Sequence, residues 1–478
     1  MFKNKLIYGD NLKILPTIEK ESIDLIYLDP PFQSGRNYNM IFEEKNGTKS
    51  RAQIKAFEDT WLWDQTAEET YKEIIEEVPI PKLKELIQGL RATFGSNDVM
   101  AYLVMMAIRL VELHRVLKDT GSIYLHCDPT ASHYIKLVMD VIFNGKNFRN
   151  EIVWCYAGGG IPKKDFPRKH DIIFRYSKTD NYIFNIEYRP YGSWTKTFEA
   201  RHSLTSGGEK LDTEKGTPIN DWWDDLPKLT SYQGEWLPYP TQKPEALLER
   251  IIKASSNKGD VVCDPFCGCG TAIIVAEKLK RKWIGIDITP LATNVIKNRL
   301  KERLGLEKKV HYEVIGEPVD LKGAEELFNQ DSYEFQYWAL GLVGGAPLKS
   351  EEKKGMDRGI DGCIYFFDGK SDKAKKIVIQ VKGGHITSSQ IRDLKGTVDR
   401  EKAQIGVFIT LKEPTREMKK EAVSSGYYKL PLGNTSYPKI QILTIEELLE
   451  GKKIQFPFTD ITSKKSERVK VKGEQLEF

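Results

Sequence analysis

The chain has 478 residues, of which 40% are apolar and 29% charged, with a formal net charge of +4. That length predicts two or three domains with sizeable cores. The first residues lack the apolar core of a secretory signal, and the longest apolar run, residues 99–108, is too short to span a bilayer. A mildly basic balance permits nucleic-acid binding without requiring it. We therefore expect a cytoplasmic protein without a membrane partner.

The first informative element is an apolar strand that ends in a small polar turn. The strand expected over residues 23–28 runs directly into Asp29, Pro30, Pro31 and Phe32. Open α/β sheets bind ligands at the carboxyl ends of their strands, where this turn would lie. Pro31 has no N–H, so the preceding carbonyl can accept a hydrogen bond from a ligand. An ordinary strand-ending turn explains the same residues, and the motif alone does not decide.

Strands alternate with helices through most of the first 305 residues, which predicts a largely parallel sheet with helices on both faces. Besides residues 23–28, the expected strands are 5–9, 122–126, 261–264 and 283–287. The expected helices are 100–117, 244–256, 271–279 and 290–304. A helix-prone insertion interrupts the pattern at 33–97, and an aromatic-rich region interrupts it at 155–235. The fold class is therefore α/β and Rossmann-like.

A glycine-rich loop joins a strand to a helix at residues 264–271. Its residues are Asp264, Pro265, Phe266, Cys267, Gly268, Cys269, Gly270 and Thr271. Glycines let a backbone approach a ligand, and the helix amino terminus offers unpaired N–H groups. The next strand ends at Asp287, where an acid can bind ribose hydroxyls, although a helix cap also explains this residue. Three of the six cysteines, Cys263, Cys267 and Cys269, lie on this strand and turn, but no fourth ligand is near, so we expect no metal here.

These motifs resemble the β class of DNA amino-methyltransferases, which methylate exocyclic amines with S-adenosylmethionine. The order of catalytic motif, recognition region and cofactor motif matches that class. Further matching segments are residues 8–11, 116–128 and 240–244. The resemblance covers about the first 300 residues, and Cys269 stands where the class usually has serine.

The resemblance implies a role for each matching residue. Cofactor contacts would come from Asp10, Thr241, Lys243, Asp264, Pro265, Phe266, Gly268, Gly270, Thr271 and Asp287. Asp29 and the Pro30 carbonyl would accept hydrogens from the target amine, and Phe32 would stack on a base flipped out of double-stranded DNA. Asp before Pro-Pro usually marks adenine N6 and Ser marks cytosine N4, so we expect adenine. RNA or protein methyltransferases more often carry Asn there.

The aromatic-rich region lies at the class's recognition position. A basic cluster there could contact phosphates: Lys163, Lys164, Arg168, Lys169 and Arg175. Its aromatics, which we favour as a small core rather than base contacts, are Trp194, Trp222, Trp223, Tyr232 and Trp236. Phe166, His170 and Asp171 are similar to a class segment beside the flipped base, which makes Phe166 a candidate second wall.

The last third of the chain predicts a second site. Asp361 precedes a strand, and Gln380 and Lys382 lie on the next, so a hairpin would bring them together. Their oxygens could hold Mg²⁺ while the lysine assists hydrolysis. The segment is similar to Mrr-like restriction endonucleases of the PD-(D/E)XK superfamily, with Glu334 as an extra acid. A solvated hairpin, or an inactive nuclease kept for DNA binding, is the alternative.

We therefore expect a site-specific adenine methyltransferase of a restriction-modification system with a fused Mg²⁺-dependent nuclease. The expected boundaries are 1–305 for the methyltransferase, 306–330 for a linker, 331–458 for the nuclease and 459–478 for a tail. Double-stranded DNA is the expected partner, and a homodimer is left open. A modification-only enzyme, for adenine N6 or cytosine N4, whose last domain only binds DNA is the alternative.

Overall fold

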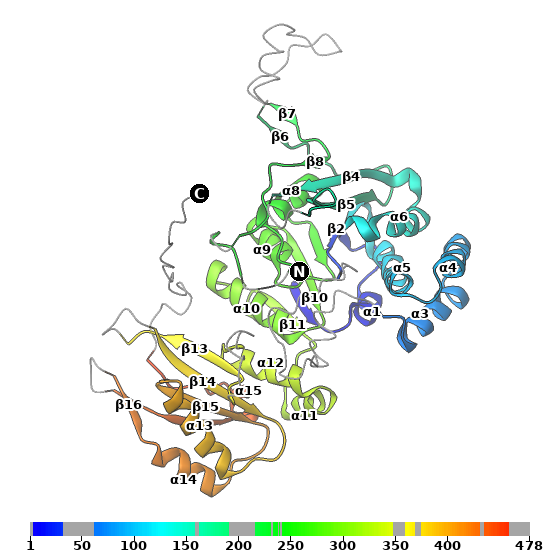
Figure 1. The fold of residues 1–478 in the computed structure, drawn as a ribbon. Coiled ribbons are helices and arrows are strands. Elements are labelled where there is room, and N and C mark those ends of the chain that lie inside the picture. Colours follow the sequence, from blue (N-terminus) through cyan, green and yellow to red (C-terminus); the bar gives the residue numbers. More distant parts are fainter. Residues whose placement is uncertain are drawn as a thin grey trace. The chain divides into compact units, whose positions relative to one another are not determined.

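The computed structural model forms two compact units, each with its own sheet (Figure 1). The structure describes residues 3–31, 62–157, 162–190, 216–230, 233–237, 239, 241–347, 359–368, 374–430 and 435–457. Apart from residues 302–304, which group with the second unit, the first unit extends to Glu317 and the second begins at Pro318. Phe32, Trp194, Tyr232 and the tail from 458 lie outside the described residues.

The first unit contains a nine-stranded sheet of order β11-β1-β10-β9-β2-β3-β5-β4-β8. The strands are β1 (Asn4–Tyr8), β2 (Ile23–Leu28), β3 (Leu117–Cys127), β4 (Phe148–Cys155), β5 (His170–Ser177), β8 (Trp222–Trp223), β9 (Val261–Asp264), β10 (Lys282–Asp287) and β11 (Tyr312–Ile315). From β11 to β3 all neighbours are parallel, and β5 is antiparallel to both β3 and β4. The Rossmann-like α/β sheet predicted from the sequence is confirmed.

Helices cover both faces of this sheet, because successive strand residues point to opposite sides. The helices are α1 (Asn11–Ile14), α3 (Gln65–Glu76), α4 (Pro81–Phe94), α5 (Asp98–Val116), α6 (Pro129–Phe143), α8 (Glu245–Ser255), α9 (Thr271–Lys278) and α10 (Pro290–Leu304), with short 3₁₀ turns at Leu15–Thr17 and Gly145–Asn147. Ile284 and Ile286 belong to the core cluster that includes α5 and α6. Between them, Gly285 faces Ile273 of α9, which would lie 2.9 Å from a Cβ at this position.

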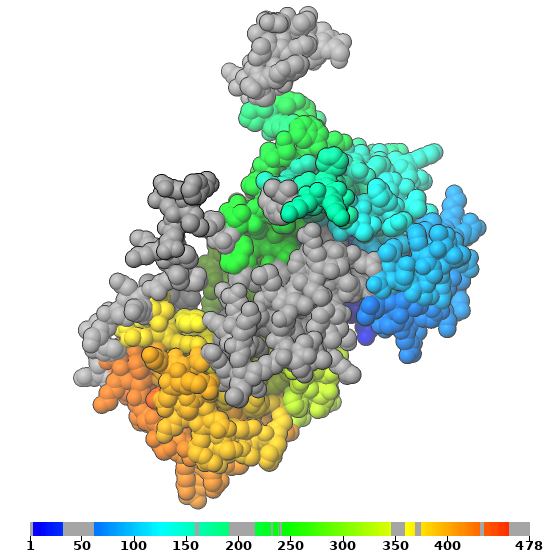
Figure 2. All heavy atoms as spheres, viewed as in Figure 1, coloured from blue at the N-terminus to red at the C-terminus, as the bar shows by residue number. Residues whose placement is uncertain are grey.

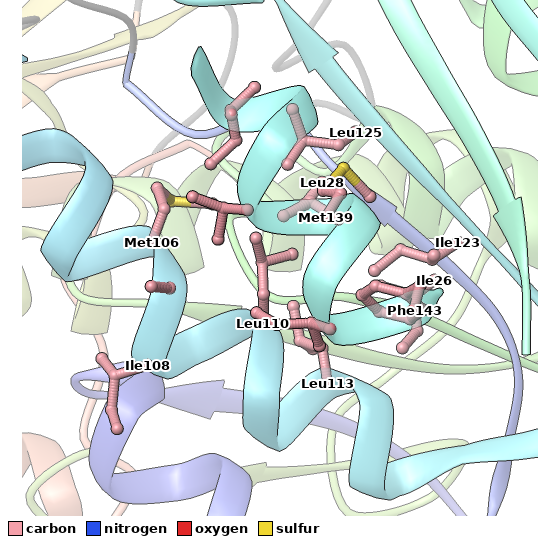
Figure 3. Close-up of a cluster of buried hydrophobic side chains, with 14 of the residues drawn as sticks. Ile26, Leu28, Met106, Ile108, Leu110, Leu113, Ile123, Leu125, Met139 and Phe143 are labelled. Atoms are coloured by element: carbon pink, nitrogen blue, oxygen red, sulfur yellow. The ribbon is translucent and has the colours of Figure 1, made fainter. Parts of the chain in front are cut away.

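The main core lies between the sheet and helices α5 and α6. Ile26 and Leu28 of β2 and Ile123 and Leu125 of β3 are fully buried, and they pack toward side chains such as Leu110 (Figure 3). The described part of the expected helical insertion, from residue 62 onward, holds α3 and α4, which form a projecting lobe of the first unit (Figure 2). No helix in the described ranges is long and apolar enough to cross a membrane.

Two regions differ from the expected organisation. Residues 306–330, expected as a linker, contain β11, which pairs with β1, and helix α11 (Leu321–Gln330), which packs in the second unit. The segment shows little apolar periodicity, and β11 is a short edge strand with one buried residue, so the sequence gives a weak signal for it. Within 155–235, β5 and β8 join the main sheet, and β6 (Tyr188–Arg189) pairs with β7 (Thr217–Pro218). The aromatic-rich region is therefore partly continuous with the sheet.

The second unit is a five-stranded sheet of order β12-β13-β14-β15-β18 with helices on both faces. Its strands are β12 (Ala346–Pro347), β13 (Gly362–Phe366), β14 (Lys375–Lys382), β15 (Ile405–Thr410) and β18 (Ile440–Thr444), with a separate pair β16 (Tyr427–Lys429) and β17 (Ser436–Pro438). Besides α11, its helices are α12 (Ser332–Leu342), α13 (Ser388–Arg400), α14 (Arg416–Ser424) and α15 (Ile445–Leu449). β13 and β14 form the predicted antiparallel hairpin.

Candidate active site

Four acidic residues follow neighbouring parallel strands of the first unit. Asp10 comes after β1, Asp287 ends β10, Asp264 ends β9 and Asp29 comes after β2. These four strands are adjacent in the order β1-β10-β9-β2. Because parallel strands end at one edge of a sheet, their carboxylates gather where such folds bind ligands.

The glycine loop is fixed in place by hydrogen bonds to the strand ends beside it. The Gly268 N–H donates to Asp287 Oδ2 at 2.8 Å, so the loop is tied to the end of the next strand. Gly270 precedes α9 with φ of 79°, and a Cβ there would lie 2.6 Å from Ile296 Cγ1. Only glycine fits this left-handed, crowded position. The predicted residues Asp264 and Thr271 flank the loop and are both buried.

Burial shapes the electrostatics of the two acids beside this loop. It raises the pKa of Asp264 well above the ordinary value, against a hydrogen bond from the Phe266 N–H. It also raises the pKa of Asp287 to about 6, although backbone N–H groups of Thr289 and Gly268 donate to its carboxylate. A carboxylate held in this way can accept hydrogens from a polar ligand such as a ribose. The glycine cradle and these acceptors fit a nucleoside that carries an amino-acid group.

A buried arginine that sequence reasoning missed connects the Gly-Asp motif to the glycine loop. Arg109 of α5 donates to Asn11 Oδ1 at 2.6 Å and to Asp10 Oδ1 at 3.2 Å. The Asn11 amide in turn donates to the Pro265 carbonyl at 2.7 Å. Asp10 also caps α1 by accepting from the Leu12 N–H. One cation therefore fixes two parts of the candidate cofactor site.

The turn after β2 is paired with a lysine from the segment before α8. Asp29 Oδ2 lies 2.5 Å from Lys243 Nζ, and their side chains are 15% and 11% exposed. Pro30 is buried and Pro31 is exposed. Thr241, predicted in the same segment as Lys243, is exposed with φ of 63°, an uncommon backbone state for a non-glycine residue. The expected catalytic and cofactor segments thus meet at Asp29 and Lys243.

A partly buried chain of hydrogen bonds beside Asp29 links β2, β3 and β5 to Tyr156, the residue that follows β4. Tyr27 OH lies 3.2 Å from His126 Nδ1, His126 Nε2 lies 3.1 Å from Asp171 Oδ2, and Tyr156 OH donates to Asp171 Oδ1 at 3.0 Å. Burial opposes ionisation of Asp171, but the hydrogen bond with His126 and the charges of His126 and Lys243 lower its pKa to about 2. The resemblance to the β class singled out Asp171 as a residue beside the flipped base, whereas His126 was included only as part of the matching segment 116–128.

The recognition region is divided between surface and interior. Phe166 is 97% exposed, the neighbouring Lys163, Lys164 and Arg168 are exposed, and Lys169 is half-buried. Arg175, expected among the phosphate contacts, is buried instead, since β5 turns it inward over the Phe184 ring. Among the expected aromatics, Trp223 is buried as predicted, while Trp222 and Trp236 are partly exposed at 46% and 39%.

In the second unit the hairpin brings Asp361 beside β14. Asp361 Oδ2 accepts from the Val381 N–H at 2.7 Å, and the Gln380 side-chain amide donates to the Gly359 carbonyl. Gln380 is buried, and Lys382 ends the same strand. Glu334 lies in the first turn of α12. Within the described part of the chain, no group of three or more His, Cys, Asp or Glu side chains could hold a metal ion.

Comparisons with known proteins match the two units to two different families. Residues 342–450 match the family model described as NACHT-associated inactive Restriction Endonuclease 1. An Mrr-like nuclease is therefore not confirmed, and the matched model is described as inactive. Among solved structures, the PvuII cytosine-N4-specific DNA methyltransferase is 16% identical with a TM-score of 0.38, and covers 65% of this chain and 89% of that one.

Among curated proteins, DNA adenine methyltransferase YhdJ of Escherichia coli strain K12 is 30% identical over 285 residues, which are 59% of this chain and 78% of the relative. The type II methyltransferase M.HpaI of Haemophilus parainfluenzae is 28% identical over 297 residues, or 62% of this chain and 74% of the relative. Residues 23–298, more than half of the chain, match the N6/N4 DNA methylase family model. The chain belongs to the N6/N4 DNA methylase family.

Proposed function

We propose that the first unit transfers a methyl group from S-adenosylmethionine to adenine N6 in double-stranded DNA. The observation that carries this proposal is the position of Asp29. It follows β2, which lies directly beside β9, the strand that enters the glycine loop. An acceptor for an amine therefore lies next to a cradle for a nucleoside cofactor.

The chemistry requires help because an exocyclic amine shares its lone pair with the ring. Asp29 and the Pro30 carbonyl would accept the two amine hydrogens, favour the pyramidal nitrogen and stabilise its developing positive charge. Both acceptors sit on a turn that two prolines hold extended, so they are oriented before the reaction. The target base reaches this turn only after it leaves the duplex, and Phe32 is proposed to stack on it.

The cofactor supplies an electrophilic methyl group on a sulfonium. The backbone of Phe266, Gly268 and Gly270 would hold its amino-acid part, and Asp287 would accept from its ribose hydroxyls. Asp10 would lie by the adenine, held there by Arg109. Asp264, Pro265 and Thr271 would shape the loop, with Thr241 and Lys243 alongside.

Adenine is favoured over cytosine by two observations. Asp29 is the first residue of the turn, where the β class usually carries Asp for adenine N6. The relative with 30% identity bears the name DNA adenine methyltransferase. The relative M.HpaI is a type II methyltransferase, which supports a role in a restriction-modification system.

Sequencing of DNA from a host that expresses the chain, read for methylated bases, tests this proposal and gives the target sequence. We expect N6-methyladenine at one motif with the native chain. Asp29→Asn should lower transfer at least about 10²–10³-fold, because one of the two amine acceptors loses its charge. Asp119→Asn, at a 68%-exposed side chain, is the matched control. Methylated cytosine at N4, or full transfer by Asp29→Asn, would refute the assignment.

For the second unit we propose the alternative role, a nuclease-like domain that binds DNA without cutting it. Gln380 and Asp361 both use side-chain atoms to hold backbone groups of the hairpin, which explains their presence without a metal. The similar family model is described as inactive. Mg²⁺-dependent cleavage by Asp361, Gln380, Lys382 and Glu334 remains a prediction to be tested.

A further inference from the structure

Lys243 forms an ion pair with Asp29, the carboxylate on which the proposed methyl transfer depends. Its ammonium lies 2.5 Å from Asp29 Oδ2. Its positive charge also acts on the carboxylates of Asp171 and Asp264. The lysine is thus a cation surrounded by acids, and both it and Asp29 are largely shielded from solvent, which strengthens their attraction.

This ion pair opposes the reaction if it persists. During transfer, the carbon–sulfur bond breaks as the carbon–nitrogen bond forms, so positive charge moves from the sulfonium to the target nitrogen. An ammonium bound to Asp29 would compete with the amine for the carboxylate and would repel that charge. Asp29 can therefore act as the acceptor only after Lys243 has moved its ammonium elsewhere.

The segment that carries Lys243 is fixed to the glycine loop. Two residues after it, Glu245 Oε1 accepts from Arg299 Nη2 at 3.1 Å. The same guanidinium donates through Nη1 to the Cys269 carbonyl at 2.7 Å. The backbone at Lys243 is consequently held beside the loop, while its long side chain extends to Asp29. A carboxylate bound at the loop would lie within reach of a change in the Lys243 rotamers.

We propose that Lys243 makes capture of the target base depend on the cofactor's carboxylate. Without cofactor, Lys243 pairs with Asp29 and blocks the amine-binding position. With cofactor, Lys243 pairs with the carboxylate of the methionine group, and Asp29 becomes available to the base. This inference rests on the proposed function, and it adds a binding order: cofactor first, base second.

Ligand binding to the full chain tests the first half of this inference without DNA. Calorimetry would compare S-adenosylhomocysteine, which carries the carboxylate, with 5′-methylthioadenosine, which lacks the amino-acid group. Lys243→Met should weaken S-adenosylhomocysteine on the order of 10–100-fold, the usual cost of losing a charged hydrogen bond, and should leave methylthioadenosine unchanged. Lys253→Met, at a half-exposed position on α8, is the matched control and should change neither affinity. Equal weakening of both ligands would overturn the carboxylate contact.

Base capture tests the second half, with 2-aminopurine placed beside the adenine that host DNA sequencing identifies as methylated, because 2-aminopurine itself lacks the N6 amine that Asp29 would bind. In the native chain, S-adenosylhomocysteine should produce the fluorescence rise of a probe whose stacked neighbour has left the duplex, and methylthioadenosine should not. In Lys243→Met, both ligands should produce the rise, because Asp29 is then open. A native response to methylthioadenosine, or loss of the rise in Lys243→Met with both ligands, would refute the mechanism. Absence of methylated adenine in the host would instead refute the proposed function, while the calorimetry would still stand.

Discussion

Each unit has an acid at the edge of a strand that suggested a catalytic site, Asp29 after β2 and Asp361 before β13, and the surroundings of the two acids differ. In the first unit, acids from four neighbouring parallel strands meet at one edge, with Lys243 and Arg109 among them. In the second, Asp361 and Gln380 belong to one antiparallel hairpin and bind its backbone. Several parallel strands bring together acids from distant parts of the chain into a candidate ligand site, whereas a single hairpin can use the same residue types to hold its own backbone.

The largest expected effect is on the glycine loop of the first unit. Gly270→Ala adds a Cβ 2.6 Å from Ile296 Cγ1 at φ of 79°. Left-handed strain of about 1–2 kcal/mol and overpacking of about 1–3 kcal/mol should lower the free energy of unfolding by ~2–5 kcal/mol. Urea denaturation measures this loss, and weaker S-adenosylhomocysteine binding should accompany it.

Gly259→Ala provides the matched control, because its φ of 91° imposes strain but nothing lies within 4 Å of the added Cβ. It should lose only about 1–2 kcal/mol and keep full ligand affinity. In the second unit, the Cβ added by Gly359→Ala would lie 2.8 Å from the Gln380 side-chain amide, the end of a flexible side chain. The loss of unfolding free energy in Gly359→Ala should therefore lie between the losses in Gly259→Ala and Gly270→Ala. Equal losses for Gly270→Ala and Gly259→Ala would show that the loop is not packed as described.

The elements that could be predicted from the sequence are those whose ends are marked by local residue patterns. The strands Ile23–Leu28 and Val261–Asp264 and the helix Pro290–Leu304 have the expected bounds, since apolar runs and caps mark their ends. Because the ends of these strands were predicted, the positions of Asp29 and Asp264 at the strand ends were predicted as well. β11 was missed because its four residues, only one of them buried, carry little pattern.

Contacts between distant residues could not be predicted in this way. Lys243 and Asp29 are 214 residues apart, and Arg109 and Asn11 are 98 apart. The motifs placed Asp29 and Lys243 in one site, but not in one ion pair. Arg109 directly follows the apolar run at residues 99–108 of α5. A charged residue next to such a run was a signal that could have been followed, because a buried charge requires a partner.

A second prediction concerns the protonation of Asp287 in the first unit. Its carboxylate must be ionised to accept ribose hydrogens, and burial raises its pKa to about 6. Affinity for S-adenosylhomocysteine should therefore be constant above pH 7 and fall by up to tenfold per pH unit below about pH 6, as the carboxyl gains a proton. Calorimetry between pH 5 and 8 measures the profile.

Asp287→Asn is the control for this pH dependence. It should weaken binding by about 10–100-fold at pH 7.5, the usual effect of removing a charged hydrogen-bond acceptor. Its affinity should then change little between pH 5 and 8, since the amide does not titrate. A native profile without a fall near pH 6, or a fall near pH 6 that persists in Asp287→Asn, would assign the ribose to another acceptor.

The smallest expected effect is in the second unit, where removal of the Lys382 side chain should not change the amount of DNA cleavage. The native chain and Lys382→Ala should both leave unmethylated plasmid intact in Mg²⁺, with or without S-adenosylmethionine, because Asp361 and Gln380 hold the hairpin backbone. Gel analysis of supercoiled, nicked and linear DNA gives the readout. Nicking by the native chain that disappears in Lys382→Ala would instead establish the predicted Mg²⁺-dependent nuclease. The hairpin would then be a second catalytic site, and one antiparallel pair of strands would suffice to build it.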